Sequence, residues 1–312
     1  MKLILDFDTG IDDAMAIALA LGEENAEVIG ITSVFGNAEV DKCVHNASAV
    51  LKLLDREDIP VFRGASHKLG ATEDYVQEPA SGIFHGLNGL GNIELPAGNN
   101  ISDQDAIEFI IESANTYKDE LIIVTTGPLT NAALAIQKDL PAMQKIKGIV
   151  SMGGALTVPG NVSPFAEANF WKDSEANNVV FDSGLPIKVI GLDVTLRTLI
   201  TDTDIEPWKE ISEAGKTFHE IVTYYFKAYA NSYANLTGCA LHDPLAVSVA
   251  LNSDWVTGET FRIKSLYDKQ QGRLVQDQAA LNRGETPNVF VALGVDAEAY
   301  NKHFLETIQK AF

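Results

Sequence analysis

Four aspartates stand within eight residues near the start of the chain, namely Asp6, Asp8, Asp12 and Asp13. They follow the apolar run 3–5, and Gly10 permits a tight turn among them. One ordinary interpretation is that Asp12 caps a helix and the others are exposed, but capping explains one or two acids and not four. Carboxylates packed at the end of a strand repel one another unless a cation neutralises them. The cluster therefore predicts a hard divalent metal with oxygen ligands, and the sequence alone does not separate Ca²⁺ from Mg²⁺.

Two known motifs offer alternatives for this segment. An EF-hand loop counted from Asp6 needs glycine at its sixth position and glutamate at its twelfth, whereas here glycine is fifth and the twelfth residue is Ile17. The run Asp6–Thr9 also resembles the first motif of haloacid dehalogenase-like phosphatases, in which the first aspartate attacks phosphate and the second is the acid and base. A metal-dependent phosphatase with Asp6 as nucleophile is therefore a serious alternative.

Other candidate residues are less specific when each is taken alone. Asp243 precedes Pro244, and this pair is typical of a helix start, so spacing alone favours a capping role for Asp243. Three polar residues follow a glycine pair, namely Asn161, Glu167 and Asn169, and asparagine beside glycine usually serves turn chemistry. A lone histidine such as His242 is more often structural, although it can carry a transferable proton near neutral pH.

The elements that must position these residues follow a repeated strand and helix pattern. Five apolar runs are typical of buried strands, namely Leu3–Leu5, Val28–Val34, Leu121–Thr125, Gly148–Met152 and Ile187–Ile190. Amphipathic stretches between them predict helices over Asp13–Leu21, Val40–Leu54, Asp105–Tyr117 and Ser174–Phe181. Repeated βαβ units imply an α/β fold, a mostly parallel open sheet with helices on both faces. Ligands of such sheets bind outside the carboxyl ends of the strands.

The last third of the chain has a different pattern. It is mainly helical from Asp202 to Tyr233, adds a helix over His242–Leu251, and predicts a hairpin region over Phe261–Val275. Three tyrosines recur at a spacing of four, namely Tyr225, Tyr229 and Tyr233, which is typical of a packed helix face, so we do not assign them to a site. No linker, repeat or composition break divides the chain. We expect a single domain over residues 1–312 with a helical excursion.

The composition restricts the partners and the compartment. Of 312 residues, 46% are hydrophobic, which suits a globular protein with an extensive core. The net charge of −20 argues against a nucleic-acid partner and against an anionic membrane surface. Cys43 and Cys239 lie far apart without metal-type partners, so we expect neither a disulfide framework nor a thiolate zinc site. Residues 1–6 do not resemble a signal peptide, and no apolar run reaches membrane-spanning length, so we expect a cytoplasmic protein.

The run Asp6-Phe7-Asp8-Thr9-Gly10-Ile11-Asp12-Asp13-Ala14 closely resembles the N-terminal signature of the inosine-uridine type nucleoside hydrolases. Six further segments resemble motifs of that family in the same order, namely Val34–Asn37, His85–Gly91, Thr126–Asn131, Met152–Gly154, Gly160-Asn161 with Glu167–Asn169, and His242–Pro244. The phosphatase resemblance has no such downstream support. Two positions depart from the family pattern, because Thr9 stands where many members have proline and Asn88 where aspartate is frequent.

The resemblance implies hydrolysis of ribonucleosides to ribose and free base by a Ca²⁺-bound water. It implies that Asp8 contacts the metal and accepts the proton of that water, and that Asp13 binds the metal with both oxygens. Asp243 and the backbone carbonyl of Thr126 would complete the protein ligands. Asp6 is expected to support the metal site, either as a ligand or from behind the ligands. A cation lowers the pKa of coordinated water, so a nearby carboxylate can complete its activation at neutral pH.

The resemblance also assigns the residues around the sugar and the base. The expected ribose clamp consists of Asp12, Asn37, Asn161, Glu167 and Asn169. Such contacts orient and distort the sugar, so they act on turnover as well as on binding. His242 is the expected acid for the leaving group. The presence of a histidine at this position resembles the broad-specificity and pyrimidine-preferring branches of the family. His85 lies in a glycine-rich segment that we expect to form a flap over the base.

The partners implied by the resemblance are a ribonucleoside substrate and further copies of the chain in a homodimer or homotetramer. Two other classes of function remain alternatives at this stage. A phosphatase would release phosphate from a panel of esters and no ribose from nucleosides. A non-catalytic calcium- or nucleoside-binding module would bind its ligand tightly without turnover.

Overall fold

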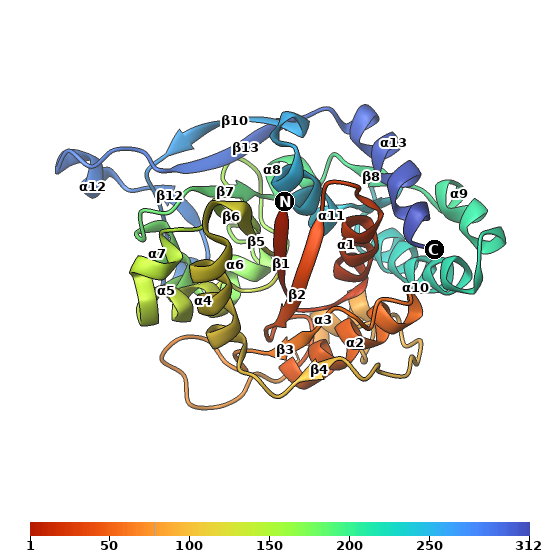
Figure 1. Ribbon diagram of the computed structural model, residues 1–312. Coiled ribbons are helices and arrows are strands. Elements are labelled where there is room, and N and C mark those ends of the chain that lie inside the picture. Colours follow the sequence, from red (N-terminus) through yellow and green to blue (C-terminus); the bar gives the residue numbers. More distant parts are fainter. Residues whose placement is uncertain (78) are drawn as a thin grey trace.

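The computed structural model describes residues 1–77 and 79–312, and its centre is a nine-stranded sheet (Figure 1). The strands of this sheet are β1 (Lys2–Phe7), β2 (Glu27–Ser33), β3 (Val61–Arg63), β4 (Ile101–Ser102), β5 (Leu121–Thr125), β6 (Gly148–Met152), β7 (Ile187–Ile190), β10 (Val256–Phe261) and β13 (Val289–Val295). Their spatial order is β10-β13-β7-β6-β5-β1-β2-β3-β4. All neighbours are parallel except β10, which runs antiparallel to β13. The predicted mostly parallel α/β sheet is confirmed.

Helices cover both faces of the sheet (Figure 1). One face packs against α1 (Ile11–Gly22), α2 (Val40–Leu53), α10 (Glu213–Ser232), α11 (His242–Leu251) and α13 (Ala297–Ile308). The other face packs against α4 (Ala106–Tyr117), α5 (Thr130–Met143) and α7 (Ser174–Phe181). Leu3 and Leu5 join the first of these cores, whereas Ile4 joins the second, because successive strand side chains point to opposite faces. Burial on both faces explains the continuous apolar runs in the sequence.

Shorter elements complete the chain. They are α3 (Pro79–His85), α6 (Ala168–Lys172), α8 (Leu192–Thr195), α9 (Asp202–Ile205), α12 (Gln278–Asn282), and the 3₁₀ turns Lys118–Glu120, Glu206–Glu210, Ser253–Trp255, Asp268–Gln270 and Gln309–Ala311. Two small antiparallel ladders pair β8 (Leu199–Ile200) with β9 (Cys239–Ala240) and β11 (Ile263–Ser265) with β12 (Leu274–Gln276). The predicted helical excursion corresponds to α9 and α10, and the predicted late hairpin to β11 and β12. The single-domain organisation stays a prediction.

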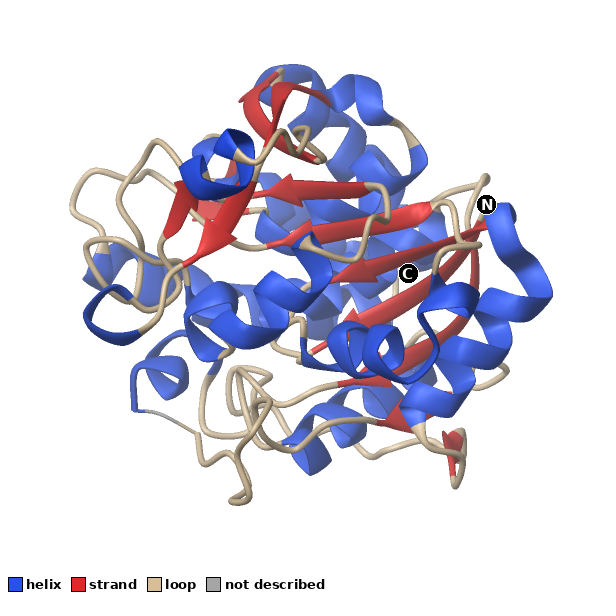
Figure 2. Cartoon of the chain, turned by 90° about the vertical axis from the view of Figure 1, so that its left-hand side faces the viewer, coloured by secondary structure: helices blue, strands red, loops and turns tan. Residues whose placement is uncertain are grey.

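The sheet has a switch in its connections beside β1. The chain leaves β1 for β2, β3 and β4 on one side, then returns to place β5 on the other side of β1. Figure 2 shows most strand arrows pointing the same way, with long loops gathered at the arrowheads. Ligands of such sheets bind where the strand order reverses, outside the carboxyl ends. The acidic loop after β1 therefore occupies the expected position for a site.

Two further expectations concern the cysteines and the membrane. Cys43 and Cys239 are both buried and free of disulfides. Within the described residues, no helix is both long enough and apolar enough to cross a membrane.

Candidate active site

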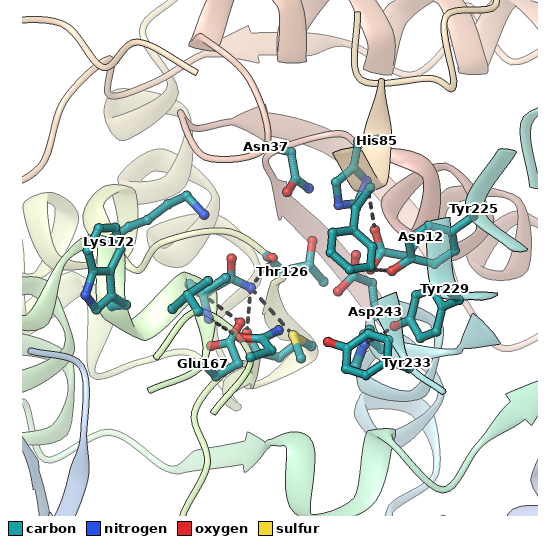
Figure 3. A pocket seen from close by; sticks show the side chains of 18 residues that line it. Asp12, Asn37, His85, Thr126, Glu167, Lys172, Tyr225, Tyr229, Tyr233 and Asp243 are labelled. Carbon is teal, nitrogen blue, oxygen red and sulfur yellow. Dashed lines mark hydrogen bonds and ion pairs between the residues drawn. The ribbon is translucent and has the colours of Figure 1, made fainter. Parts of the chain in front are cut away.

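A cavity of about 260 Å³ lies at this edge of the sheet, and its lining residues come from segments far apart in the sequence (Figure 3). Its floor contains Asp12, Asn37, Thr126 and Asp243. One wall is polar, with Asn161, Glu167, Asn169 and Lys172. The other wall is aromatic, with Phe84, His85, Tyr225, Tyr229, Tyr233 and His242. A ligand with one polar and one flat aromatic end would match these two walls.

Three buried aspartates at the floor form the acidic centre of the site. One carboxylate oxygen from each of Asp12, Asp13 and Asp243 lies within 4.8 Å of the other two. Burial, and then repulsion by Asp12, Asp13 and Asp8, raises the pKa of Asp243 well above its ordinary value. Asp12 Oδ1 is buried and accepts no hydrogen bond from the described residues. Buried carboxylate oxygens that still have free lone pairs are suitable ligands for a hard divalent cation.

Asp13 is held in this cluster by several hydrogen bonds. Its Oδ2 accepts hydrogen bonds from the backbone N–H of Gly10 at 2.8 Å and from Asn37 Nδ2 at 3.2 Å. Its Oδ1 accepts from Thr126 Oγ1 at 2.5 Å. Burial and the neighbouring Asp12 nevertheless raise the pKa of Asp13 to about 7. These hydrogen bonds favour the ionised carboxylate, but they do not offset the cost of burying its charge beside Asp12. A bound cation would remove that cost.

Asp8 lies behind the floor and is fully buried. Its Oδ2 accepts from the Asn37 backbone N–H at 2.7 Å, and its Oδ1 accepts from Asn37 Nδ2 at 3.2 Å. Burial first and repulsion by Asp13 second raise its pKa well above the usual range. Gly36 is required beside it, because a Cβ at that position would lie 1.9 Å from Asp8 Oδ2. Asn37 thus joins Asp8 and Asp13 into one hydrogen-bonded unit.

Asp6 is fully buried one layer below the cavity. Its Oδ1 accepts from Thr32 Oγ1 and from Asn131 Nδ2, each at 2.7 Å. Burial raises the pKa of Asp6 to about 6, against the effect of these two donors. Its backbone carbonyl accepts from the Thr126 N–H at 3.1 Å. Asp6 thus holds the Thr126 backbone through its own carbonyl and, like Asp8 and Asp13, is not among the described residues that line the cavity.

The polar wall is built around the start of α6. Glu167 caps that helix, and its carboxylate accepts from the backbone N–H groups of Gly154, Asn169 and Phe170. A carboxylate has about four acceptor sites, so one remains for a ligand. Asn169 Nδ2 donates to the Thr126 carbonyl at 2.6 Å, which is the carbonyl expected to bind the metal. Asn161 Oδ1 accepts from the Ala168 N–H at 3.0 Å.

The aromatic wall consists mainly of the tyrosines that we did not assign to the site. Ring centroids lie 4.8 Å apart for Tyr225 and Tyr229, and 5.2 Å apart for Tyr229 and Tyr233. Phe84 from α3 packs edge-on against Tyr229 with centroids 5.7 Å apart. The spacing of four correctly places the tyrosines on one face of α10, but the same spacing is typical of ordinary packing. No signal in the sequence separates these tyrosines from an ordinary packed face, because their contact with His242 comes from another helix.

The two histidines of the site are buried and differ in their partners. His242 Nε2 lies 2.7 Å from the Tyr229 hydroxyl, and its Nδ1 lies 2.7 Å from Thr195 Oγ1. Burial lowers the pKa of His242 to about 4. His85 Nδ1 accepts from the Ile11 N–H at 3.2 Å, so its proton resides on Nε2 in the neutral form. Burial also lowers the pKa of His85.

The candidate residues are thus close together, with differences in detail. Asp12, expected at the ribose, also contributes an oxygen to the acidic cluster. Its Oδ2 accepts from the Tyr225 hydroxyl at 3.2 Å. Asn88 lies away from the cavity, where its amide donates to the Ile93 carbonyl at 2.8 Å. Lys172, in the polar wall, was not identified from the sequence.

Comparison with known proteins gives consistent matches over nearly the whole chain. The sequence profile described as inosine-uridine preferring nucleoside hydrolase matches residues 3–302. The chain is 36% identical over 260 residues to uridine nucleosidase 1 of Arabidopsis thaliana, covering 82% of this chain and 75% of that protein. It is 35% identical over 307 residues to the pyrimidine-specific ribonucleoside hydrolase RihA of a Shewanella species, covering 96% and 93%.

Solved structures give the same picture. The purine-preferring ribonucleoside hydrolase from Gardnerella vaginalis superposes with a TM-score of 0.96 at 39% sequence identity, covering all of this chain (100%) and 99% of that one.

Proposed function

Because the chain belongs to the inosine-uridine preferring nucleoside hydrolase family and is a ribonucleoside hydrolase, we propose a Ca²⁺-dependent mechanism in which Asp8 is the base. The observation that carries this proposal is the buried cluster of Asp12, Asp13 and Asp243 at the floor of a cavity with one polar and one aromatic wall. A nucleoside has the matching chemistry, with a polar sugar joined to a flat aromatic base.

The proposed protein ligands of the cation are Asp8, Asp13, Asp243 and the backbone carbonyl of Thr126. Burial raises the pKa of each of the three aspartates. This supports their assignment as ligands, because a cation would stabilise their ionised forms. A bound Ca²⁺ would supply Lewis-acid chemistry that lowers the pKa of a water molecule. Asp6 supports the site from below through Thr126 and Asn131.

Asp8 is proposed to accept the proton of the attacking water. A general base needs a pKa near the working pH, and a carboxylate whose pKa is raised by burial satisfies this better than an exposed one. The two hydrogen bonds from Asn37 hold the Asp8 carboxylate in one orientation. The alternative phosphatase would instead require Asp6 to attack; its Oδ1 accepts hydrogen bonds from Thr32 and Asn131, and its Oδ2 is buried without a hydrogen-bond partner among the described residues.

The proposed ribose clamp consists of Asp12, Asn37, Asn161, Glu167 and Asn169. All five line the cavity, and Glu167 keeps one carboxylate acceptor site for a sugar hydroxyl. Several of these groups are fixed by backbone hydrogen bonds before substrate binds. Such preorganisation orients the sugar for loss of the base and acts on turnover.

His242 and Tyr229 are proposed to protonate the leaving base together. With its pKa lowered by burial, the imidazole of His242 is neutral near pH 7. A neutral imidazole can still relay a proton by accepting at one nitrogen while it donates from the other. The Tyr229 hydroxyl at 2.7 Å from Nε2 supports a role as the group that contacts the base, with Thr195 fixing the ring from behind. His85 is proposed to cover the base from α3.

The preferred base, the assembly and the compartment are further proposals. Relatives include a uridine nucleosidase, a pyrimidine-specific hydrolase and a purine-preferring hydrolase, so the family name alone does not select a base. The His242–Tyr229 pair and the aromatic wall support acceptance of both purines and pyrimidines. We also propose a homodimer or homotetramer in the cytoplasm.

A reducing-sugar assay over inosine, adenosine, guanosine, uridine and cytidine tests the proposal. Ribose should be released in the presence of Ca²⁺ and should not be released after exhaustive chelation. Phosphate release from esters without ribose release from nucleosides would favour the phosphatase alternative. Tight nucleoside binding with no turnover in Ca²⁺ would favour the binding-module alternative.

A further inference from the structure

The short helix α8 contacts residues at both ends of the cavity, although it does not line the cavity itself. Its four residues, Leu192–Thr195, follow β7 at the carboxyl edge of the sheet and are at most 1% exposed. None of the four is among the described residues that line the cavity. Two of them are polar, Asp193 and Thr195, and a buried polar side chain is costly unless its hydrogen bonds are satisfied. The partners of these two side chains therefore show what the helix holds in place.

Asp193 fixes the start of the loop that follows β6. Its Oδ2 accepts from the Leu156 backbone N–H at 2.9 Å. Its Oδ1 accepts from the Thr157 N–H at 2.7 Å and from Thr157 Oγ1 at 2.5 Å. Three donors from two neighbouring residues thus converge on one buried carboxylate. Hydrogen bonds to a carboxylate are among the stronger ones in proteins, so this contact holds the loop firmly.

The backbone beside Asp193 holds the same loop one step earlier. The Leu192 N–H donates to the Gly154 carbonyl at 2.9 Å. Gly191 permits this close approach, because a Cβ at that position would lie 2.6 Å from the Gly154 carbonyl oxygen. The Gly154 N–H in turn donates to Glu167 at 2.8 Å. The junction of β7 and α8 is therefore connected to the polar wall through main-chain contacts as well as through Asp193.

The loop needs such an anchor because it has little buried surface of its own. Thr157 and Asn161 are both exposed, although Asn161 lines the cavity. The far end of the loop is tied to the start of α6, since Asn161 Oδ1 accepts from the Ala168 N–H at 3.0 Å. A segment with few buried contacts opens easily unless hydrogen bonds hold it. Asn161 is thus held between two anchors, Asp193 on one side and α6 on the other.

Thr195 directs its hydroxyl to the other end of the cavity. It lies two residues after Asp193, and at 3.6 residues per turn this corresponds to a rotation of about 200° around the helix. The two side chains therefore point to opposite sides of α8. Thr195 Oγ1 lies 2.7 Å from Nδ1 of His242, the first residue of α11. One buried helical turn thus contacts both the loop of the polar wall and the histidine of the aromatic wall.

We propose that α8 positions groups at both ends of the substrate, with Asp193 as a positioning residue for the ribose and Thr195 as one for His242. The proposal rests on the ribose and acid assignments of the proposed function. Asp193 acts through Asn161, because it fixes the loop that carries this side chain into the cavity. Contacts that are held in place before the substrate binds act on turnover as well as on binding.

The test compares uridine and inosine with nitrophenyl riboside in the Ca²⁺-loaded enzyme. All three carry the same ribose, but only the two nucleosides need a proton on the leaving group. Asp193→Asn should lower kcat/KM about 10- to 100-fold on all three substrates, partly through kcat, because the amide NH₂ group would face a backbone N–H. Thr195→Val should lower kcat about 10-fold on the nucleosides and spare nitrophenyl riboside. The control Asp105→Asn, which alters a helix-capping aspartate outside the cavity, should change neither.

Three further measurements separate positioning from a general loss of stability. Hydrogen exchange at the Leu156 and Thr157 amides should be faster in Asp193→Asn, with the central strands unchanged. In an Asn161→Ala background, Asp193→Asn should have a smaller effect on kcat/KM than in the wild type, because both changes act on one contact. Thr157→Val removes one of the three hydrogen bonds at an exposed position, so it should fold and show smaller losses in the same direction.

The outcomes decide each part of the proposal. A lower Tm with unchanged kcat/KM in Asp193→Asn overturns the role of Asp193, and so does a loss confined to the two nucleosides or full additivity with Asn161→Ala. Unchanged nucleoside turnover in Thr195→Val overturns the role of Thr195, and unchanged turnover in His242→Ala would also remove the acid assignment. If Asn161→Ala leaves kcat/KM unchanged, the proposed ribose clamp fails at that residue. In that case faster exchange at Leu156 and Thr157 in Asp193→Asn still supports the anchoring of the loop, and unchanged exchange overturns it.

Discussion

Removal of metal should make the thermal stability of this protein fall as the pH rises above neutrality. Burial first and mutual repulsion second raise the pKa values of Asp8, Asp13 and Asp243. A carboxyl with a higher pKa in the folded state keeps a proton that the unfolded chain has already lost. Stability therefore declines as pH rises between the unfolded and folded pKa values, and stays low above them.

Asp13 gives a scale for this effect. Its pKa rises from 3.8 to about 7, which corresponds to about 4 kcal/mol lost between about pH 4 and pH 7. His242 opposes this loss, because its pKa falls from 6.5 to about 4 and stability returns as pH rises through that interval. Above about pH 6.5 the histidine contribution is complete and only the carboxyls still change. Between about pH 6.5 and pH 8, we expect a loss of about 1 to 4 kcal/mol.

The assay is thermal unfolding of metal-free and Ca²⁺-loaded protein at these two pH values. The Tm of the metal-free protein should fall by about 2 to 6 °C between them. Ca²⁺ should raise the Tm at both values, and more at about pH 8, because its ligands must be ionised. Asp243→Asn should reduce both the pH dependence and the Ca²⁺ effect. A metal-free Tm that is flat or rises over this range, or an equal Ca²⁺ effect at both pH values, would refute the reasoning.

Three further predictions concern individual side chains. Gly36→Ala should lower turnover at least about 100-fold, because the new Cβ would lie 1.9 Å from Asp8 Oδ2, while circular dichroism should show that the fold is retained. Near-normal turnover would show that Asp8 need not keep its orientation. His242→Ala and Tyr229→Phe should both slow cleavage of inosine or uridine and should spare cleavage of nitrophenyl riboside, because its phenolate leaves without a proton. Equal losses on both kinds of substrate would instead indicate a positioning role. Asp6→Asn should cost less turnover than Asp8→Asn; loss of all activity together with a phosphoryl-enzyme on Asp6 would restore the phosphatase alternative.

Strands that are buried on both faces were predictable from the sequence, and short or edge strands were not. The runs for β1, β2, β5, β6 and β7 were found because burial on both faces leaves a continuous apolar signal. β3 and β4 have 3 and 2 residues, too few for a period. β10 is an edge strand and is mostly exposed or half-buried, so it has no apolar run to recognise. β13 contains a readable apolar run and was within reach of the same reasoning.

Candidate residues that follow strands or match a family motif were predictable from the sequence. Residues whose role depends on contacts made only in the folded structure were not. Thr126 directly follows the predicted strand Leu121–Thr125 and Asp8 comes three residues after the predicted strand Leu3–Leu5, which placed both at one edge of the sheet. Tyr229 has the spacing of an ordinary packed helix, so its contact with His242 becomes visible only in three dimensions. From the sequence Lys172 would be expected on the surface, because lysine is seldom buried, and its place in the wall of the cavity is visible only in the fold.

The most direct test of the proposed mechanism is ribose release from uridine and inosine by the wild type and Asp8→Asn, each with Ca²⁺ and after chelation. The wild type should be active only with Ca²⁺. Asp8→Asn should remain folded and should turn over several orders of magnitude more slowly even with saturating Ca²⁺, because both the base and a metal ligand are altered. Full activity in the chelated wild type, or near-normal turnover by Asp8→Asn, would contradict a Ca²⁺-dependent hydrolysis in which Asp8 takes the proton from water.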